Sequence, residues 1–557
     1  MDKSQTKICQ NCESSFAIEP DDFAFYEKMN VPAPALCSDC RMKRKLVWRN
    51  ERTLYKRICD LCGKSIIAIY NPSYTAPIYC FDCSYSDKWD PWSYGFVYNP
   101  ELPFFQQFKE LLSRMPKAAT HIGTGDLQNV NSEYVNFAGG NKDCHLLFNS
   151  TKNENCSYCR GVFQSRDSLD LYFNDQAELC YEGVNVNRSN SVFWSQNSSN
   201  CLNSYFLLDC LDCQNCFGCV NLRHKSYYFW NEPLLKEEWN KRVSEVLGNY
   251  YKMEETKTKF KEFSLNFPSK ENNNLKAVNC SNNYIFESKN CTSCFEVFCS
   301  ENCKYSIYVK LLKDGYDNVG RGVKSELLLE TLGVGHGCSR VIGTWTAENS
   351  HDIEYSFDLR ACSNCFGCVG LKHAEYCILN HKYSENDYHI LRQKIIAELK
   401  KDGAYGLYMP PELSPWSYNE TLAQENYPLT KEEAKDQGFR WEDNIPRSRN
   451  KETLKIEDIP NNIKDAKDDI CNEILKCIEC GYNYKLIRSE LDFYKQMNIP
   501  IPRKCFNCRH DDRLKLRGPM VAYDRKCDKC GRDIKTFYAP DRPEIIYCES
   551  CYNNEVA

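Results

Sequence analysis

The middle of the chain alternates small polar residues with apolar ones in short segments, as in SVFWSQNSSNCLNSYF (191–206). Such alternation is typical of β-strands, in which successive side chains point to opposite faces. Apolar positions also recur every 21 residues in three series: Cys159, Cys180 and Cys201; Phe163, Val184 and Tyr205; Leu171, Val192 and Cys213. The repeat predicts a mainly β fold, a parallel β-solenoid with about 21 residues per coil and coils about 4.8 Å apart.

The solenoid is predicted to have two halves, because NCFGCVNL (215–222) recurs as NCFGCVGL (364–371), 149 residues later. Each half ends in a pattern with helical spacing, over 232–247 and 385–401, and a third such pattern covers 103–115. We therefore divide the chain into seven segments: an N-terminal two-zinc module (1–98), a helical linker (99–125), solenoid half 1 (126–231), a helical insertion (232–270), solenoid half 2 (271–383), a helix and linker (384–475), and a C-terminal two-zinc module (476–557).

The two ends of the chain are duplicates of each other. Each carries four CxxC pairs, and every C-terminal cysteine lies 468 positions after its N-terminal counterpart. The intervening residues agree as well, since FYEKMNVPAP (25–34) corresponds to FYKQMNIPIP (493–502). The paired cysteines are Cys9, Cys12, Cys37, Cys40, Cys59, Cys62, Cys80 and Cys83 at one end and Cys477, Cys480, Cys505, Cys508, Cys527, Cys530, Cys548 and Cys551 at the other.

Paired CxxC motifs are typical of structural zinc sites. Two thiolates on one tight turn grip the same ion, and a second pair completes a closed tetrahedron. The sequence thus predicts four structural Zn²⁺ ions per chain and makes catalytic zinc improbable, because no coordination position is left for water. Redox-active CxxC motifs or buried thiols are the alternatives, but they do not explain four evenly matched pairs at each end.

The segment CIECGYNYKLIRSELDFYKQMNIPIPRKCFNCR (477–509) resembles the zinc-ribbon, treble-clef-like family of bacterial proteins. CDKCGRDIKTFYAPDRPEIIYCESC (527–551) resembles the small CxxCG…YCxxC ribbon that often follows it, and the N-terminal copy is similar. This resemblance implies that all sixteen cysteines are zinc ligands. The family often has Gly after its FYxxx motif, where Asn30 and Asn498 stand here. The whole architecture resembles that of proteins from candidate-phyla bacteria.

The remaining cysteines need a separate interpretation. The chain has 36 cysteines in 557 residues, and without an export signal we expect reduced thiols rather than disulfides. CxxCxxCxxC at 210–219 would suit an iron–sulfur or fifth zinc site. Cys213, however, continues the Leu171 and Val192 series. We therefore favour small buried residues for the solenoid cysteines.

Charge and hydropathy limit location and partners. No apolar run is long enough for a transmembrane helix, and the N-terminus has no signal-like apolar region. We expect a cytoplasmic protein with no membrane partner. The formal net charge is −5, and four filled four-thiolate sites add −8 to give −13. Indiscriminate coating of nucleic acid is thereby disfavoured.

Basic residues nevertheless cluster after the second CxxC pair of each module, with aromatic residues among them. Such clusters could contact RNA phosphates and stack on bases, or could balance the negative charge of the zinc sites. The candidate nucleic-acid-binding residues are Arg41, Lys43, Arg44, Lys45, Trp48, Arg49, Arg509 and Arg513.

No Walker, GxGxxG or GxSxG motif opens a helix, and the nine histidines are scattered. The sequence favours a non-enzymatic zinc-binding scaffold that contacts RNA or a ribonucleoprotein through its basic zinc modules. The alternatives are a protein–protein interaction scaffold and a β-helix enzyme acting on carbohydrate.

Overall fold

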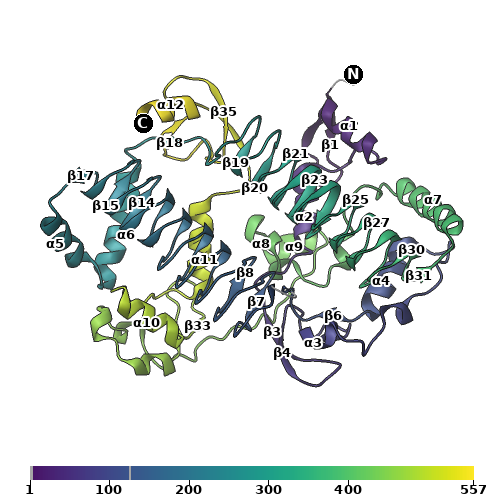
Figure 1. Cartoon of the computed structure of the whole chain (residues 1–557), viewed down its shortest axis with the longest axis horizontal. Helices are drawn as coiled ribbons and strands as arrows, with labels where there is room; N and C mark the ends of the chain where they lie inside the picture. The colour runs from purple at the N-terminus through teal and green to yellow at the C-terminus, as the bar shows by residue number, and fades with distance from the viewer. Residues whose placement is uncertain (1–3, 124–126, 557) are drawn as a thin grey trace. The chain divides into compact units, whose positions relative to one another are not determined.

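The chain forms two compact units, each assembled from two separated pieces. The computed structural model describes residues 4–123 and 127–556 (Figure 1), so the predicted boundary at 125/126 lies outside the described residues. Unit 1 comprises Met1–Ala119 and Asn272–Ile445, and unit 2 comprises Thr120–Glu271 and Pro446–Ala557. The N-terminal module therefore belongs with the second half of the predicted solenoid, and the C-terminal module belongs with the first.

Unit 2 contains an 11-stranded sheet that is parallel apart from its last hairpin, seen in Figure 1 as the short arrows from β7 to β15. Its strands are short, and the pairing advances along the chain in even steps, so that Tyr172 faces both Arg160 and Val184. The strands are β7 (Val135–Asn136), β8 (Leu147–Phe148), β9 (Arg160–Phe163), β10 (Tyr172–Asp175), β11 (Val184–Asn187), β12 (Asn190–Phe193), β13 (Gln196–Ser199), β14 (Leu202–Leu208), β15 (Gln214–Val220), β16 (Ser226–Phe229) and β17 (Glu232–Pro233).

Unit 1 contains the corresponding 13-stranded sheet, again parallel apart from a terminal hairpin. Its strands are β19 (Asn282–Phe286), β20 (Cys294–Phe298), β21 (Glu301–Lys304), β22 (Ile307–Val309), β23 (Leu312–Arg321), β24 (Ser325–Leu332), β25 (Ser339–Ile342), β26 (Trp345–Glu348), β27 (His351–Glu354), β28 (Phe357–Arg360), β29 (Ser363–Phe366), β30 (Glu375–Ile378) and β31 (His381–Lys382). Paired residues of neighbouring strands are mostly 12 positions apart, but at two places they are 13 apart: Leu312 faces Ser325, and Glu326 faces Ser339.

The coil length predicted from the sequence is wrong, because the pairing register of both sheets advances by 12 in most steps and not by 21. The backbone turns at every third residue instead. Asn185, Arg188, Ser191, Trp194 and Asn197 all have φ between 48° and 56°, the left-handed region that asparagine tolerates better than most residues. Both 12 and 21 are multiples of three. The apolar series spaced by 21 residues in the sequence therefore reflect this triplet pattern and not the pairing register of the strands.

The interior between these turns is filled mainly by cysteine, valine and leucine side chains. Cys180, Val186, Val192, Cys201 and Leu207, spaced by multiples of three, are at most 2% exposed. The polar members of the interior are satisfied locally: Ser189 Oγ donates to the Asn187 carbonyl and accepts from the Cys201 N–H, at 2.9 and 3.1 Å. The thiol of Cys201 likewise donates to the Ser199 carbonyl at 3.3 Å. Cysteine is therefore used here as a small, weakly polar core residue.

The run Cys210, Cys213, Cys216 and Cys219 follows the same rule, since all four are at most 1% exposed and donate to backbone carbonyls. Among the described residues, four groups of potential ligands converge closely enough to share a metal ion, and none includes a cysteine of the sheets. The core interpretation of this run is thus supported.

Substitution of Cys180 tests how tightly the interior is packed. Cys180→Leu adds volume to a fully buried position, and overpacking of this kind costs about 1–3 kcal/mol. Cys180→Ser preserves the size class and the hydrogen bond to the Glu178 carbonyl, so we expect a loss below about 1 kcal/mol. Equilibrium urea unfolding of both variants measures the difference. Equal midpoints would mean that the interior has room to spare.

The helical predictions agree in position with the structure. They correspond to α4 (Phe104–Arg114), α5 (Lys236–Val246) and α7 (Glu385–Lys401). A further helix, α6 (Tyr250–Ser264), follows α5, and the short helices α8 (Leu422–Asn426) and α9 (Lys431–Asp436) lie in unit 1. The segment after α7 is well packed, because Trp416 is 1% exposed and stacks on Tyr70. No described helix is long and apolar enough to cross a membrane.

The two modules have matching secondary structure. The N-terminal module contains β1 (Gln5–Ile8), β2 (Ser15–Ile18), α1 (Pro20–Lys28), α2 (Ser38–Leu46), β3 (Tyr55–Ile58), β4 (Ser65–Ala68), β5 (Ile78–Tyr79) and α3 (Phe81–Ser84). The C-terminal module contains β32 (Leu475–Lys476), β33 (Asn483–Tyr484), α10 (Arg488–Gln496), α11 (Phe506–Arg517), β34 (Tyr523–Lys526), β35 (Asp533–Thr536), β36 (Ile546–Tyr547) and α12 (Glu549–Val556). Strand β5 pairs with β6 (Lys117–Ala118), and β36 pairs with β18 (Ser269–Lys270).

Candidate metal centres and module interfaces

Each group of four cysteines is built from a hairpin and a helix start. In the first group, Cys9 and Cys12 lie in the turn between β1 and β2, Cys37 is the residue before α2, and Cys40 lies in the first turn of that helix. The hairpin turn needs left-handed backbone, supplied by Glu13 here and by a glycine in the other three groups. The helix start supplies free N–H groups and a favourable dipole for negative sulfur.

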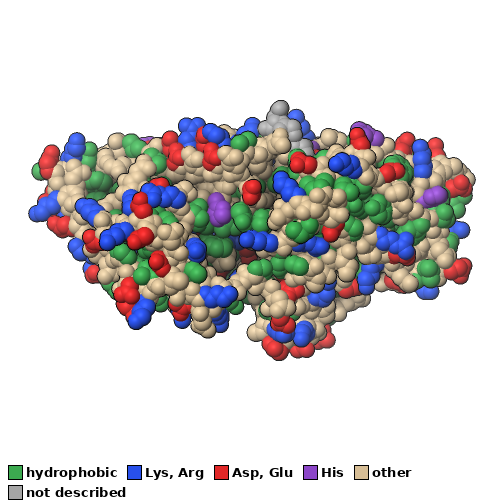
Figure 2. All heavy atoms as spheres, turned by 90° about the horizontal axis from the view of Figure 1, so that it is seen from below, with side chains coloured by type: hydrophobic (Ala, Val, Ile, Leu, Met, Phe, Trp, Pro, Cys, Tyr) green, Lys and Arg blue, Asp and Glu red, His purple; other side chains and the backbone are tan. Residues whose placement is uncertain are grey.

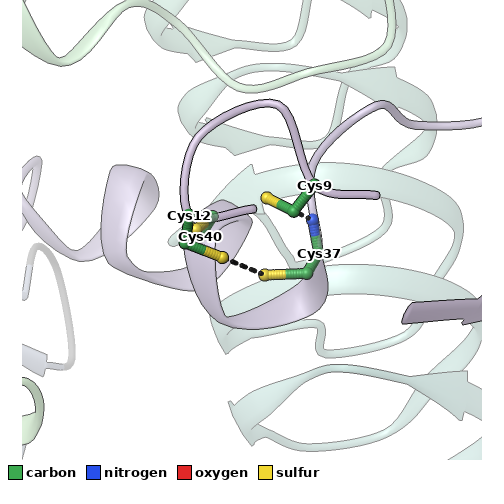
Figure 3. A group of neighbouring side chains, drawn as sticks. All are labelled: Cys9, Cys12, Cys37 and Cys40. Carbon is green, nitrogen blue, oxygen red and sulfur yellow. Dashed lines mark hydrogen bonds between the residues drawn. The ribbon is translucent and has the colours of Figure 1, made fainter. Parts of the chain in front are cut away.

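All sixteen predicted ligands are brought together in four groups, in which the sulfur atoms lie within 4.8 Å of one another. Figure 3 shows the first group, with the four thiols converging from the hairpin and the helix. Zinc–sulfur bonds of about 2.3 Å imply tetrahedron edges of about 3.8 Å. The closest sulfur pairs match this edge, at 3.7 Å for Cys12–Cys37, Cys477–Cys508 and Cys480–Cys505 and 3.8 Å for Cys62–Cys80 and Cys530–Cys548.

The first cysteine of each group is prepared to bind as a thiolate. Burial raises the pKa of the Cys9 thiol, but backbone N–H groups of Cys37, Cys12 and Asn11 outweigh this and lower the pKa to about 6. The same balance gives a pKa of about 6 for Cys59 and Cys527 and about 7 for Cys477. In each case the helix-start N–H donates to the sulfur, as from Cys37 to Cys9 at 3.3 Å.

The donor set limits what these centres can do. All 36 cysteines are free thiols, and the 3.7–3.8 Å sulfur separations are far longer than the bond of about 2.05 Å in a disulfide. Four thiolates around one divalent cation saturate a tetrahedral site, as in structural zinc centres, and leave no open position for a substrate. Each group can therefore hold one metal ion.

The turn that separates the two cysteine pairs is also duplicated. Asn30 and Asn498, where the resembled family often has glycine, have φ of 55° and 52°. Asparagine adopts this left-handed conformation more readily than most residues. The departure from the family pattern therefore leaves the turn intact.

The basic cluster of the N-terminal module faces the sheet of unit 1. Arg41 pairs with Asp317 at 3.0 Å and with Glu330 at 3.5 Å, and Lys45 pairs with Glu330 at 2.6 Å. All four side chains are at most 3% exposed. Burial raises the pKa of Glu330 to about 7, while the neighbouring ammonium of Lys45 opposes that rise.

The C-terminal module repeats this arrangement within unit 2. Arg509 pairs with Asp170 at 2.9 Å and with Glu490 at 3.1 Å, and Arg513 pairs with Asp170 at 2.8 Å. Tyr158 donates from its hydroxyl to Glu490 at 2.9 Å. These side chains are also buried.

The two interfaces share equivalent arginines, aspartates and tyrosines, whereas their glutamates differ in origin: Glu330 lies in strand β24 of the sheet and Glu490 in helix α10 of the module. Arg509 follows Arg41 by 468 positions, whereas the sheet residues Asp170 and Asp317 differ by 147. The two longer steps of the unit 1 sheet come after Asp317, which accounts for the larger offset of 149 found further along the sheets. Each arginine also lies 5.1 Å from the ring centre of a tyrosine at the same 147 offset, Tyr305 or Tyr158. The duplication thus includes how each module packs on its sheet.

This packing buries most of the residues predicted to form a nucleic-acid surface. Arg41, Lys45, Trp48 and Arg49 are at most 3% exposed, as are Arg509 and Arg513. Arg49 pairs with Glu51 at 2.6 Å, and the Trp48 carbonyl accepts from the indole of Trp345. These six side chains are therefore turned away from solvent, and the ion pairs of Arg41, Lys45, Arg509 and Arg513 join module to sheet.

The remaining two candidates are partly exposed and already bonded. Lys43 donates to Gln437, and Arg44 donates to the Tyr408 carbonyl. Figure 2 shows one face of the molecule, on which blue Lys and Arg side chains are interspersed with red Asp and Glu. The sequence signal that was missed is the pair Asp170 and Asp317, acids at the same position of two otherwise similar repeats.

Comparisons with known proteins add little. No family model and no curated protein matches the chain. A solved structure named an acetyltransferase, from Desulfovibrio desulfuricans G20, matches over 48% of this chain and 70% of its own. It is 9% identical with a TM-score of 0.11, so the match carries no argument about fold or activity.

Proposed function

We propose that the protein is a non-enzymatic scaffold that binds other proteins and is held together by four structural zinc ions. In this proposal, two β-solenoids with short coils, one in each unit, provide the binding surfaces. Each zinc-ribbon module keeps its solenoid in one shape. The observation that carries the proposal is that four complete four-thiolate groups lie in modules fastened to the sheets by buried ion pairs.

The ligands favour zinc over hard divalent cations. Soft thiolate donors in a tetrahedron suit Zn²⁺ or iron, whereas Mg²⁺ and Ca²⁺ require oxygen donors. A saturated site gives the metal a structural role, because catalysis by zinc needs an open position for water or substrate. The folding free energy linked to each such site is on the order of 10 kcal/mol.

The burial of the basic residues in ion pairs favours a protein partner over RNA. Binding of RNA relies on exposed cations that meet phosphates. Six of the eight candidate residues are buried, and five of those are cations in ion pairs within their own unit. RNA binding therefore becomes the alternative outcome of the test below.

The test combines metal analysis with capture of partners. Purified full-length chain should contain four zinc ions per chain by mass spectrometry, one for each thiolate group. Cross-linking in cells should then give one dominant protein partner that survives nuclease treatment. Nuclease-sensitive capture with co-purifying RNA would replace this proposal with the RNA alternative. Iron in place of zinc would overturn the metal assignment.

A further inference from the structure

Unit 2 has a cleft of about 960 Å³ between its parallel sheet and helix α10 of the C-terminal module. Four carboxylates line it, and no lysine or arginine is among the described lining residues. Those carboxylates belong to Glu133, Asp143, Asp167 and Asp492. Asp492 is engaged by Arg488 at 2.9 Å. The other three face the cleft without an ion pair among the described residues, so its electrostatic character is that of a cation acceptor.

The corresponding place in unit 1 shows what such a carboxylate binds. Asp314 follows Asp167 by 147 positions, the same offset that relates the interface acids. In unit 1, Asn302 donates to one oxygen of Asp314 at 2.9 Å, and Lys28 of α1 donates to the other at 2.8 Å. In unit 1, Asp314 thus accepts a hydrogen bond from the ammonium group of a lysine.

Unit 2 has the equivalent aspartate and asparagine but lacks the lysine. Asn155 donates to one oxygen of Asp167 at 2.9 Å, matching the asparagine of unit 1. The residue 468 positions after Lys28 is Gln496, which also lines the cleft. A glutamine cannot supply the positive charge, so the second oxygen of Asp167 stays open in the described part of the unit.

The walls of the cleft suit the rest of a lysine side chain. The rings of Tyr134 and His145 lie tilted to each other with their centres 5.2 Å apart, and Phe493 of α10 also lines the cleft. Aliphatic stems of lysine commonly lie along such apolar surface while the ammonium reaches a polar partner. Asp143, whose carboxylate accepts from Asn131 at 3.0 Å, repeats the motif two steps earlier in the sheet register. A second lysine of the same segment would meet it.

We infer that this cleft binds a lysine-bearing segment of a partner protein, with Asp167 accepting the ammonium in the way that Asp314 accepts Lys28. This inference rests on the proposed function as a protein-binding scaffold and names the chemistry of the partner. The ion pair and hydrogen bond to a partly buried carboxylate give the contact its strength.

The experiment uses the zinc-loaded full chain and a fluorescent peptide that carries alternating lysines, with a glutamine-substituted peptide as the control ligand. We expect one peptide bound per chain, and we expect Asp167→Asn to weaken binding about tenfold or more, the loss of one charge-assisted hydrogen bond. Asp524→Asn removes the same charge from a side chain that is 84% exposed and outside the cleft. This control should bind as the wild type does.

Two reciprocal substitutions sharpen the test. Gln496→Lys should build the internal ion pair of unit 1 into unit 2 and block the peptide. Lys28→Gln should open the equivalent site in unit 1 and raise the stoichiometry from one peptide to two. Titration with anisotropy detection measures both changes.

Several outcomes would overturn the inference. Unchanged affinity in both Asp167→Asn and Gln496→Lys would place the peptide elsewhere, and equal binding of the glutamine peptide would exclude ammonium recognition. Binding of spermidine but not of the peptide would make the ligand a free amine. If a captured partner still binds the Asp167→Asn chain at full affinity, this inference fails while the proposed function stands.

Discussion

Replacing Cys37 by serine is expected to reduce bound zinc from four ions per chain to three, since the four thiolate groups are independent. Cys37 is both a ligand and the residue before α2, and its backbone N–H holds the Cys9 sulfur. With the ion lost, on the order of 10 kcal/mol of folding free energy disappears from this part of the module. Mass spectrometry of the metal and hydrogen exchange of residues 4–46 measure the two effects. The exchange protection of α2 should collapse.

The matched control is a cysteine of the sheet interior. Cys210→Ser removes a buried thiol that is not part of any four-thiolate group, so it should retain all four ions. Cys505→Ser, at the equivalent position of the C-terminal module, should repeat the loss of one ion and unprotect α11 instead of α2. A chain with Cys37→Ser that still carries four ions would disprove the assignment of this site.

Truncating Asp170 is expected to have the second-largest effect. Asp170→Ala leaves Arg509 and Arg513 buried without the carboxylate that pairs with both. Removing one partner from a buried ion network costs about 3–5 kcal/mol, because the remaining charge stays desolvated. Equilibrium unfolding by urea measures the loss. Unit 2 should unfold at a lower concentration than in the wild type, and metal content should be unchanged at mild denaturant.

The control for this substitution is Asp524→Ala, whose ion pair with Lys535 is exposed and worth at most about 1 kcal/mol. Asp317→Ala provides the same test in unit 1, where it leaves Arg41 with a longer contact to Glu330. If Asp170→Ala unfolds at the same urea concentration as the control, the network does not fasten the module to the sheet.

The metal ligands could be predicted from the sequence because the chemistry is local. Two residues between paired cysteines set a turn, and the constant offset of 468 shows that the arrangement is used twice. The positions of the helices were also predictable, since each has its own apolar periodicity. These features do not depend on which distant segments meet.

The coil length and the module interfaces could not be predicted in this way. A triplet pattern of inward side chains is compatible with any pairing register that is a multiple of three, so spacing alone did not distinguish a register of 12 from one of 21. The basic face of α2 was interpreted as a surface because its acid partners are remote: Asp317 lies 276 positions after Arg41. The residues next to a charged side chain in the sequence do not show whether it forms a buried ion pair with a carboxylate far along the chain.

Because the pieces of the two units alternate along the sequence, the partners of each interface are synthesised far apart in time. At about 5–20 residues per second, a ribosome takes roughly 14 to 55 s to extend the 276 positions from Arg41 to Asp317. Asp170 is synthesised earlier, and its own partner Arg513 comes 343 positions after it. The first carboxylate of this kind to be synthesised after the N-terminal module is therefore Asp170, the equivalent of Asp317 and the partner of the other module. Any early pairing of Arg41 with Asp170 would have to reverse before the native contacts form, so the duplication offers the chain an alternative pairing that competes with its native state.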